Sequence, residues 1–331
     1  MSDSLEVTFQ AIAEDQPGEK WLACYERTSP KWHEWYLRKG LDRLPTVAEC
    51  RHALSRHMPK WLAVHDRMCA IVNNDEISAR LLSWWNPPPL ISGCSVLALR
   101  DPEPVLIRSY DFTPRFFDGI IGKTSFCGRQ VIAMCEGTSG CLDGVNEDGL
   151  AAALTFGGRL AHGSGFGIPL IVRYVLETCA TTDEAVRLLC DLPSAGVQNV
   201  MLLDRHGDHA VVYLRPDRPA QALRKPAVTN HQERVEWEGA NNTRTVERHQ
   251  YLLELLEAYA GDPEAAISAF LKPPLYHTDF ENWFGTLFTA AYYPARGEVR
   301  YLWKDDEWRQ GFEAFQEGVR VKRLLLDGVA A

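Results

Sequence analysis

The sequence predicts an α+β fold built from layers of helices and strands, and three observations carry this prediction. Strand-like stretches, a pair of strong helices, further strands and a last helix follow one another along the chain. They do not alternate as regular βαβ units, which would indicate a parallel sheet. With 331 residues, of which 46% are apolar and 24% charged, the chain is long enough to bury a large core.

Residues 1–86 are predicted to be mainly helical. The stretch CRHALSRHMPKWLAVHDRMCAIV repeats apolar residues every three or four positions, and DEISARLLSWW begins with residues that cap helices. Six of the ten tryptophans lie in this segment, where they are expected to anchor helix packing; covering a substrate pocket is the alternative role. Residues 86–90, with three consecutive prolines, then end the helix and form a rigid extended linker.

From Cys94 onwards the pattern becomes that of strands. The stretches CSVLALRD and PVLIRSYDF are predicted to form a hairpin that turns at Asp101-Pro102. Two helices are expected in IPLIVRYVLETCATTDEAVRLLCDLP, separated around residues 180–183, and another in TRTVERHQYLLELLEAYAG, which ends at Gly261. Further strands are expected at residues 130–135, 150–156, 200–203, 210–213, 287–293 and 299–303.

Charge and composition exclude several classes of function. A formal net charge of −9 argues against a surface for nucleic acid or for an anionic membrane. The first residues show no secretion signal, and no apolar stretch approaches the roughly 18–20 residues of a membrane span. Nine cysteines without such a signal argue against a disulfide framework. We therefore expect a cytoplasmic protein with neither a nucleic-acid nor a membrane partner.

The most informative point of the chain is Gly93-Cys94, between the proline linker and the hairpin. A cysteine nucleophile needs thiolate character and a nearby base. If Cys94 became a chain N-terminus, its own α-amino group, with an ordinary pKa of about 7.7, could serve as that base. An acyl-transfer site also needs hydrogen-bond donors for the oxyanion, and a positive neighbour would stabilise the thiolate.

The segments GCS, RSYD, GVNEDGLAAALTFGG, VTNH and NTRTVERHQYL occur in the order seen in cysteine N-terminal-nucleophile (Ntn) hydrolases. That superfamily includes choloylglycine hydrolases, penicillin V acylases, the acid ceramidase group and acyl-CoA:6-aminopenicillanic acid acyltransferase. The chain most resembles the acyltransferase-like family, which also carries a helical propeptide that ends in glycine before the cysteine. The resemblance spans essentially the whole chain and implies an αββα four-layer sandwich.

The resemblance also implies a role for residues near the expected cleavage site. Cys94 would be the nucleophile, first for self-cleavage after Gly93 and then for attack on the substrate. Arg108 and Asp111, in RSYD, match the family's Arg-x-x-Asp. In the family the arginine lies near the thiol, and the aspartate binds the free α-amino group.

The remaining matches concern the oxyanion and the charge around it. Asn230, in VTNH, matches the side-chain oxyanion donor, and Asn199 is the alternative. Thr155, in LTFGG, matches the residue whose backbone N–H is the second donor. Arg248, in TVERH, matches an arginine that supports the charge network, with Arg244 as the alternative by spacing.

By this resemblance, residues 1–93 are a propeptide retained as a helical subunit, and residues 94–331 form the catalytic domain. The expected substrate is a small N-acyl compound whose linear amide bond is hydrolysed, since hydrolysis requires no second binding site. Alternatives are acyl transfer from acyl-CoA or an amide to an amine, a binding protein on the same scaffold, and a cysteine hydrolase with His231 as base. The two fragments should stay associated, and a homo-oligomer is compatible with the sequence.

No cofactor or metal is expected. The glycine-rich stretch HGSGFG lacks both the Lys-Ser/Thr pair of a phosphate loop and the acidic partner of a dinucleotide site. His206 and His209 have a spacing that metal ligands use, but they fall in a polar turn without further ligands.

Overall fold

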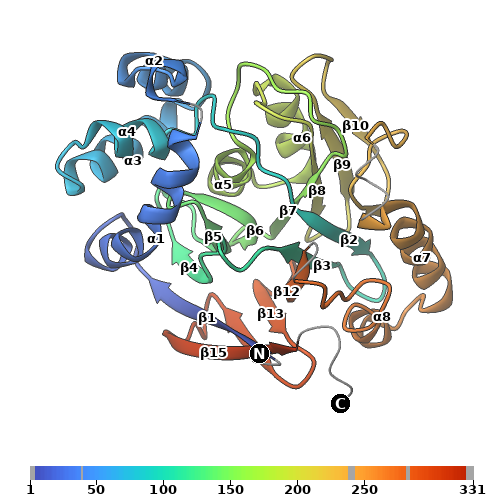
Figure 1. Cartoon of the computed structure of the whole chain (residues 1–331). Helices are drawn as coiled ribbons and strands as arrows, with labels where there is room; N and C mark the ends of the chain where they lie inside the picture. Colours follow the sequence, from blue (N-terminus) through green and yellow to red (C-terminus); the bar gives the residue numbers. More distant parts are fainter. Residues whose placement is uncertain (1–3, 39, 238–242, 281–283, 326–331) are drawn as a thin grey trace.

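The protein is a four-layer sandwich in which two β-sheets lie face to face between layers of helices (Figure 1). The computed structural model describes residues 4–38, 40–237, 243–280 and 284–325. Within them, the larger sheet has the order β10-β9-β8-β7-β6-β5-β4-β1-β15 and the smaller sheet the order β11-β2-β3-β12-β13-β14. Helices α5 (Ile168–Thr178) and α6 (Thr182–Asp191) pack on the larger sheet, and α7 (Thr245–Ala258) and α8 (Pro263–Ala269) pack on the smaller one.

The hairpin predicted from Cys94 onwards is confirmed. It consists of β2 (Gly93–Leu99) and β3 (Val105–Phe112), which pair antiparallel and are buried along their whole length. Strands on both flanks of the hairpin pair with its edges and complete the smaller sheet, whose faces are covered by the larger sheet and by α7 and α8. Its other strands are β11 (Ala227–Val228), β12 (Gly285–Tyr293), β13 (Glu298–Leu302) and β14 (Glu307–Gly311).

The larger sheet contains four of the predicted strands and several that the sequence pattern did not identify. The predicted ones are β5 (Val131–Glu136), β7 (Leu150–Phe156) and the hairpin of β8 (Gln198–Asp204) with β9 (His209–Leu214). In β6 (Gly140–Asn146), small and polar residues conceal the strand pattern, although every residue is buried. The other strands missed in this sheet are β1 (Ser4–Ala13), β4 (Ile120–Thr124), β10 (Gln221–Leu223) and β15 (Gly318–Leu325).

The N-terminal segment is mainly helical, as predicted, but it begins with a strand of the larger sheet. In β1, Val7, Phe9 and Ala11 are buried at alternate positions, which is the pattern of a strand with one face on a core. The strand pairs antiparallel with β15 and parallel with β4, so it lies inside the sheet rather than at its edge. The helices that follow are α1 (Glu19–Leu37), the short 3-10 helix η1 (Leu41–Arg43), α2 (Val47–His57), α3 (Pro59–Ile71) and α4 (Glu76–Leu82).

Tryptophans of this segment anchor it to the rest of the molecule, as the packing interpretation predicts. Trp32 donates a hydrogen bond to Asp118 (2.9 Å), and Trp84 donates one to the Gly137 carbonyl (3.2 Å). Trp84 approaches Gly137 so closely that a Cβ there would lie 2.0 Å from its ring, and Gly137 also has a positive φ of 62°. Only glycine fits this position, so the packing of Trp84 explains why it is glycine.

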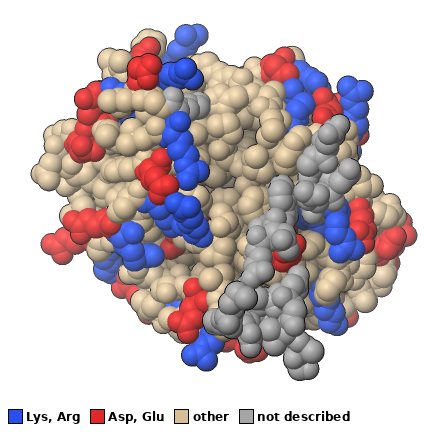
Figure 2. Space-filling model, viewed as in Figure 1, with Lys and Arg blue, Asp and Glu red and all other residues tan. Residues whose placement is uncertain are grey.

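Charges of both signs are mixed around the rim of the face in Figure 2, whereas the centre of that face is largely uncharged. A mixed rim of this kind produces no large field of one sign on this face. Among the described residues, none of the helices has the length and apolar character needed to cross a bilayer.

Candidate functional site

Cys94 is the second residue of β2 and is fully buried between the two sheets. In the β2–β3 pairing it lies opposite Tyr110, which places Arg108, two residues away on β3, on the same side of the sheet. Arg108 Nη2 donates a hydrogen bond to Cys94 Sγ over 3.0 Å. The hairpin therefore brings together two of the predicted site residues by simple strand register.

A carboxylate of the opposite sheet holds Arg108 in this position. Arg108 forms a buried ion pair with Asp143 of β6, and the Tyr292 hydroxyl donates to the same carboxylate. Burial alone would lower the pKa of Arg108, but Asp143 and the neighbouring sulfur raise it above its ordinary value, so the guanidinium stays charged. Burial also raises the pKa of the Cys94 thiol, and Arg108 only partly offsets that effect. The buried thiol therefore needs help to lose its proton.

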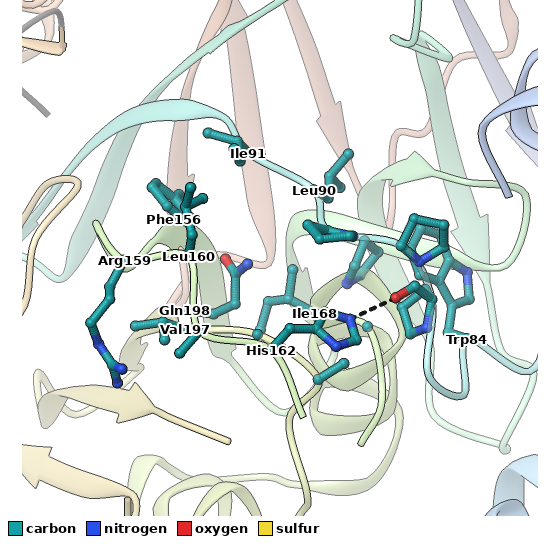
Figure 3. Close-up of a pocket in the computed structure, with 18 residues that line it drawn as sticks. Trp84, Leu90, Ile91, Phe156, Arg159, Leu160, His162, Ile168, Val197 and Gln198 are labelled. Atoms are coloured by element: carbon teal, nitrogen blue, oxygen red, sulfur yellow. Dashed lines mark hydrogen bonds between the residues drawn. The ribbon is translucent and has the colours of Figure 1, made fainter. Parts of the chain in front are cut away.

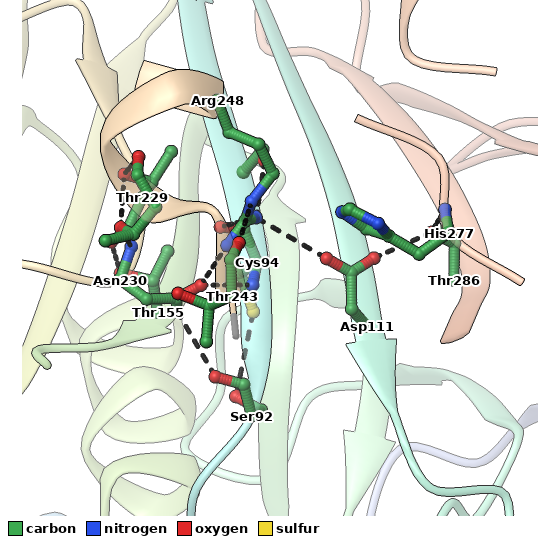
Figure 4. A network of polar contacts seen from close by, with 12 residues as sticks. Ser92, Cys94, Asp111, Thr155, Thr229, Asn230, Thr243, Arg248, His277 and Thr286 are labelled. Atoms are coloured by element: carbon green, nitrogen blue, oxygen red, sulfur yellow. Dashed lines mark hydrogen bonds and ion pairs between the residues drawn. The ribbon is translucent and has the colours of Figure 1, made fainter. Parts of the chain in front are cut away.

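Asp111 lies directly beside the peptide bond that precedes Cys94. It pairs with Gly93 across the hairpin, and a Cβ at position 93 would lie 2.9 Å from the Cβ of Asp111. Its carboxylate accepts a hydrogen bond from the Thr286 hydroxyl (2.7 Å) and lies 3.5 Å from Arg248 Nη1 (Figure 4). The close strand contact accounts for glycine before the cysteine.

Asn230 contacts the backbone on both sides of the Gly93-Cys94 bond. Its Oδ1 accepts a hydrogen bond from the Cys94 backbone N–H (3.0 Å), and its Nδ2 donates to the carbonyl oxygens of Ser92 (3.2 Å) and Phe156 (3.3 Å). Arg248 Nη2 donates to the same Oδ1 over 2.6 Å. The carboxamide is thus fixed by partners on both of its polar atoms.

Arg248 comes from α7 and is 1% exposed. Its Nη1 donates to the Cys94 carbonyl oxygen (2.7 Å) and to the Ser95 hydroxyl (2.8 Å), and burial lowers its pKa from the ordinary value. Arg244, the alternative by spacing, is half-exposed and pairs with Glu247 on the surface. The geometry therefore brings Arg248, and not Arg244, to the cysteine.

Thr155 lies near the end of β7, where it pairs with Asn199 of β8. Its hydroxyl donates to the Thr229 carbonyl oxygen (2.8 Å) and accepts from the Asn199 carboxamide (3.0 Å). Asn199 also donates to the Thr229 and His231 carbonyl oxygens (3.2 and 3.3 Å). These two residues shape the turn that carries Asn230, so Asn199 supports the turn rather than replacing Asn230 at Cys94.

His231 is not placed to act as a base for the thiol. Its Nδ1 lies 2.9 Å from the Thr245 hydroxyl, and no hydrogen bond joins it to Cys94 in the described part of the chain. Burial, with the nearby His249 and Lys225, lowers the pKa of His231 to about 4. These contacts argue against the Cys-His alternative.

Two side chains at the site were not singled out from the sequence. Ser92 stands two residues before the nucleophile, with its hydroxyl 3.7 Å from Cys94 Sγ. Asp143 lies 35 positions after Arg108 in the chain, on the other sheet. Ser92 could have been predicted as a site residue because it directly precedes Gly93-Cys94 in the sequence. No sequence pattern near Arg108 or Asp143 indicates that the two residues pair.

A narrow, partly open pocket lies next to the site and is lined mostly by apolar side chains (Figure 3). Two of its lining residues lie close to Cys94: Phe156, whose carbonyl oxygen accepts the Asn230 hydrogen bond, and Ile91, the residue before Ser92. Arg159 lies in the pocket wall, but Asp217 binds its guanidinium through two hydrogen bonds of 2.7 Å. The remaining wall comes from Trp84, residues 87–90, residues 160–162, residues 167–169 and residues 195–198.

Among the residues that the structure describes, His, Cys, Asp and Glu side chains form no group of three or more that could hold a metal ion.

Comparison with known proteins identifies the family. Residues 99–308 match the model of the acyl-coenzyme A:6-aminopenicillanic acid acyl-transferase family. The chain belongs to this family. The matched range begins just after Cys94 and includes five of the predicted site residues: Arg108, Asp111, Thr155, Asn230 and Arg248. Membership indicates an Ntn-type enzyme of acyl transfer, either an amide hydrolase or an acyltransferase.

Two solved structures of low identity are similar to this family member. Conjugated bile acid hydrolase from Clostridium perfringens is 12% identical, with a TM-score of 0.51 over 70% of this chain and 96% of that chain. Penicillin V acylase from Agrobacterium tumefaciens is 18% identical, with a TM-score of 0.48 over 70% and 90% of the two chains. The first similarity confirms the predicted four-layer fold. No curated protein sequence matches the chain.

Proposed function

We propose that this protein is made as an inactive precursor, cuts itself between Gly93 and Cys94, and then hydrolyses the amide bond of small N-acyl compounds. The observation that carries the proposal is a pair of hydrogen bonds to Cys94, one at its sulfur and one at its backbone nitrogen. Arg108 contacts its sulfur over 3.0 Å, and Asn230 accepts a hydrogen bond from its backbone N–H over 3.0 Å. The backbone nitrogen that Asn230 holds would become the free amine after cleavage.

Self-cleavage begins with attack of Cys94 Sγ on the Gly93 carbonyl carbon. The S–C bond forms, the C–N bond between the two residues breaks, and the thiol proton passes to the nitrogen that leaves. The resulting thioester is hydrolysed by water, which releases the Gly93 carboxylate and restores the thiol. Asp111, which pairs with Gly93 across the hairpin, is placed to bind the new ammonium or amine.

In the cut enzyme the α-amine of Cys94 acts as the base for the Cys94 thiol. The Arg248 guanidinium donates to the Asn230 oxygen that holds this nitrogen, and a positive charge there favours the neutral, proton-accepting amine. The thiolate attacks the substrate's acyl carbon, the amine of the substrate leaves, and water hydrolyses the acyl-thioester. The Asn230 carboxamide N–H and the Thr155 backbone N–H are the proposed oxyanion donors.

The apolar pocket beside Phe156 is the proposed site for the acyl group of the substrate. Its one arginine, Arg159, is already neutralised by Asp217, so the pocket favours an uncharged acyl chain or ring. No cofactor enters the proposed reaction. Transfer of the same acyl group to an amine, with acyl-CoA as donor, is the second candidate, because the family name includes that reaction.

Residues 1–93 stay bound to residues 94–331 in this proposal. Loss of the N-terminal fragment would remove β1 from between β4 and β15, which would detach the edge strand β15 from the larger sheet and leave β4 with an unpaired edge. It would also expose the tryptophans that pack against the catalytic part.

Intact mass of the purified full-length protein tests the proposal. Two fragments, residues 1–93 and 94–331, are expected, and Cys94→Ala should yield one uncut chain. Cleavage of that variant at the same bond would refute self-cleavage by Cys94. The cut protein is then incubated with N-acyl amines, with and without acyl-CoA and a free amine: release of acid without acyl-CoA indicates a hydrolase, and product formed only with acyl-CoA indicates a transferase. Absence of both reactions would leave the binding-protein alternative.

A further inference from the structure

Ser92 stands on the propeptide side of the proposed cut, yet its side chain points at the nucleophile. Its hydroxyl oxygen lies 3.7 Å from Cys94 Sγ, and the residue is 5% exposed (Figure 4). Its carbonyl oxygen accepts a hydrogen bond from Asn230 Nδ2 over 3.2 Å, which fixes the backbone from which the hydroxyl projects. The hydroxyl is therefore a buried, oriented neighbour of the sulfur.

The uncut chain lacks the base that the cut enzyme uses. The Cys94 nitrogen is part of an amide, and its hydrogen is donated to Asn230 Oδ1, so it cannot take the thiol proton. Among the described residues, the side chains of Arg108 and Ser92 lie within hydrogen-bond distance of the sulfur. The Arg108 guanidinium can only donate a hydrogen bond. A serine hydroxyl both donates and accepts, so Ser92 is the one of these two neighbours that can handle the thiol proton.

We propose that Ser92 is a catalytic residue for self-cleavage alone, and that its role ends when the chain is cut. As Sγ bonds to the Gly93 carbon, the Ser92 hydroxyl accepts the thiol proton and gives its own proton to the Cys94 nitrogen as the C–N bond breaks. The serine is left unchanged, and water then hydrolyses the thioester. This inference rests on the proposed self-cleavage at Gly93-Cys94.

The position of Ser92 in the sequence confines its role to the first reaction. After the cut it lies next to a new C-terminal carboxylate on Gly93. A negative charge there disfavours the Cys94 thiolate nearby, so this end of the linker is expected to move away from the sulfur. Once it has moved, the free α-amine takes over as base. Precursor and mature enzyme would thus use different groups to receive the same thiol proton.

The test compares the rate of self-cleavage with the activity of the enzyme once cut. Ser92→Ala should slow the appearance of the two fragments by roughly 100-fold, the low end of what a proton-transfer group contributes. Ser92→Thr keeps the hydroxyl and should cleave within about tenfold of the wild-type rate. Ser139→Ala is the matched control, because Ser139 is equally buried and its hydroxyl bonds only to the Leu82 carbonyl oxygen in the described structure (3.1 Å). It should cleave at the wild-type rate.

The cut fraction of each variant, isolated after prolonged incubation, should hydrolyse an N-acyl amine with kcat/KM within about twofold of wild type. Cleavage of Ser92→Ala at the wild-type rate would overturn the inference. If Ser92→Ala lowered kcat/KM of the cut enzyme by the same factor as the rate of self-cleavage, the inference would also be overturned, since Ser92 would then serve both reactions. If Ser92→Thr cleaves as slowly as Ser92→Ala, the inference is overturned, because the fit of the side chain and not its hydroxyl group would then set the cleavage rate. Failure of self-cleavage itself has a separate signature: a wild-type chain that stays whole, or a Cys94→Ala chain that is cut.

Discussion

Asp143→Asn is expected to destabilise the fold while making the nucleophile more acidic. Arg108 and Asp143 form an ion pair in which both side chains are 0% exposed, so solvent cannot compensate either charge. Breaking a buried pair by neutralising one partner costs about 3–5 kcal/mol of unfolding free energy, because the other charge is left unpaired. Removing the carboxylate also leaves the charge of Arg108 uncompensated beside the sulfur, which favours the thiolate and lowers the pKa of Cys94.

Urea unfolding measures the first effect. It is best done in the Cys94→Ala background, where every chain is uncut and unfolding involves one molecule. The second effect is measured in the protein that retains Cys94, as the pH dependence of thiol alkylation. Arg129–Asp148 provides a matched control pair, since Asp148 is half-exposed and lies 2.6 Å from its arginine. Asp148→Asn should change stability by less than about 1 kcal/mol.

A loss below about 1 kcal/mol for Asp143→Asn would refute the view that Arg108 is held by a charged carboxylate. An unchanged or raised thiol pKa would refute the view that Asp143 restrains the charge of Arg108 at the sulfur. Replacing both partners by apolar residues, Arg108→Met with Asp143→Leu, should recover most of the lost stability, because no unpaired charge then remains.

Three further predictions follow from the contacts of single residues. Arg248→Lys should abolish or slow both self-cleavage and turnover by at least about 100-fold, because a compact ammonium cannot span the guanidinium's separate acceptors on Thr243, Cys94, Ser95 and Asn230. Arg244→Ala should leave both rates near wild type in the same mass and activity assays. Below pH 6.5 the melting temperature should fall, because His231 has a pKa of about 4 in the fold and takes up its proton first in the unfolded chain. His231→Gln should reduce the dependence of melting temperature on pH between pH 6.5 and 4. An unchanged dependence would contradict the assignment. Leu160→Asp, at an exposed position of the pocket wall, should raise KM for apolar N-acyl substrates without slowing self-cleavage. Val246→Asp is the control, because Val246 is similarly exposed but lies outside the pocket lining, and it should alter neither quantity. Equal KM values for the two variants would exclude the pocket as the acyl site.

The part of the site that the sequence predicted lies on one hairpin and on motifs with a fixed order. Cys94, Arg108 and Asp111 occupy β2 and β3, and alternation along the two paired strands is enough to put the side chains of Cys94 and Arg108 together on one face. Asp111 pairs with Gly93 and lies on the opposite face, beside the backbone that precedes Cys94. Asn230 and Arg248 came from the family resemblance, and the structure brings both to the backbone of Cys94.

What the sequence did not predict depends on pairing between distant segments. Asp143 meets Arg108 only because the two sheets stack, and nothing near either residue encodes that choice. The strand β1 has a regular alternation, but its partner β15 lies about three hundred residues later in the chain. Mixed residues such as those of β6 conceal a strand that becomes obvious only when both of its faces are seen to be buried.

The position of β1 also determines how the protein can refold before and after the proposed cut. Strand β1 pairs with β15, which ends at Leu325, so the larger sheet is complete only after the chain has been synthesised as far as β15. While the chain is continuous, the first strand is tethered to its partners and finds them at a high effective concentration. After cleavage that tether is gone, and an unfolded molecule must reassemble from two separate chains at a rate that depends on their concentration. Self-cleavage would therefore make activation a one-way event, in which heating the uncut protein is reversible and heating the cut enzyme is not.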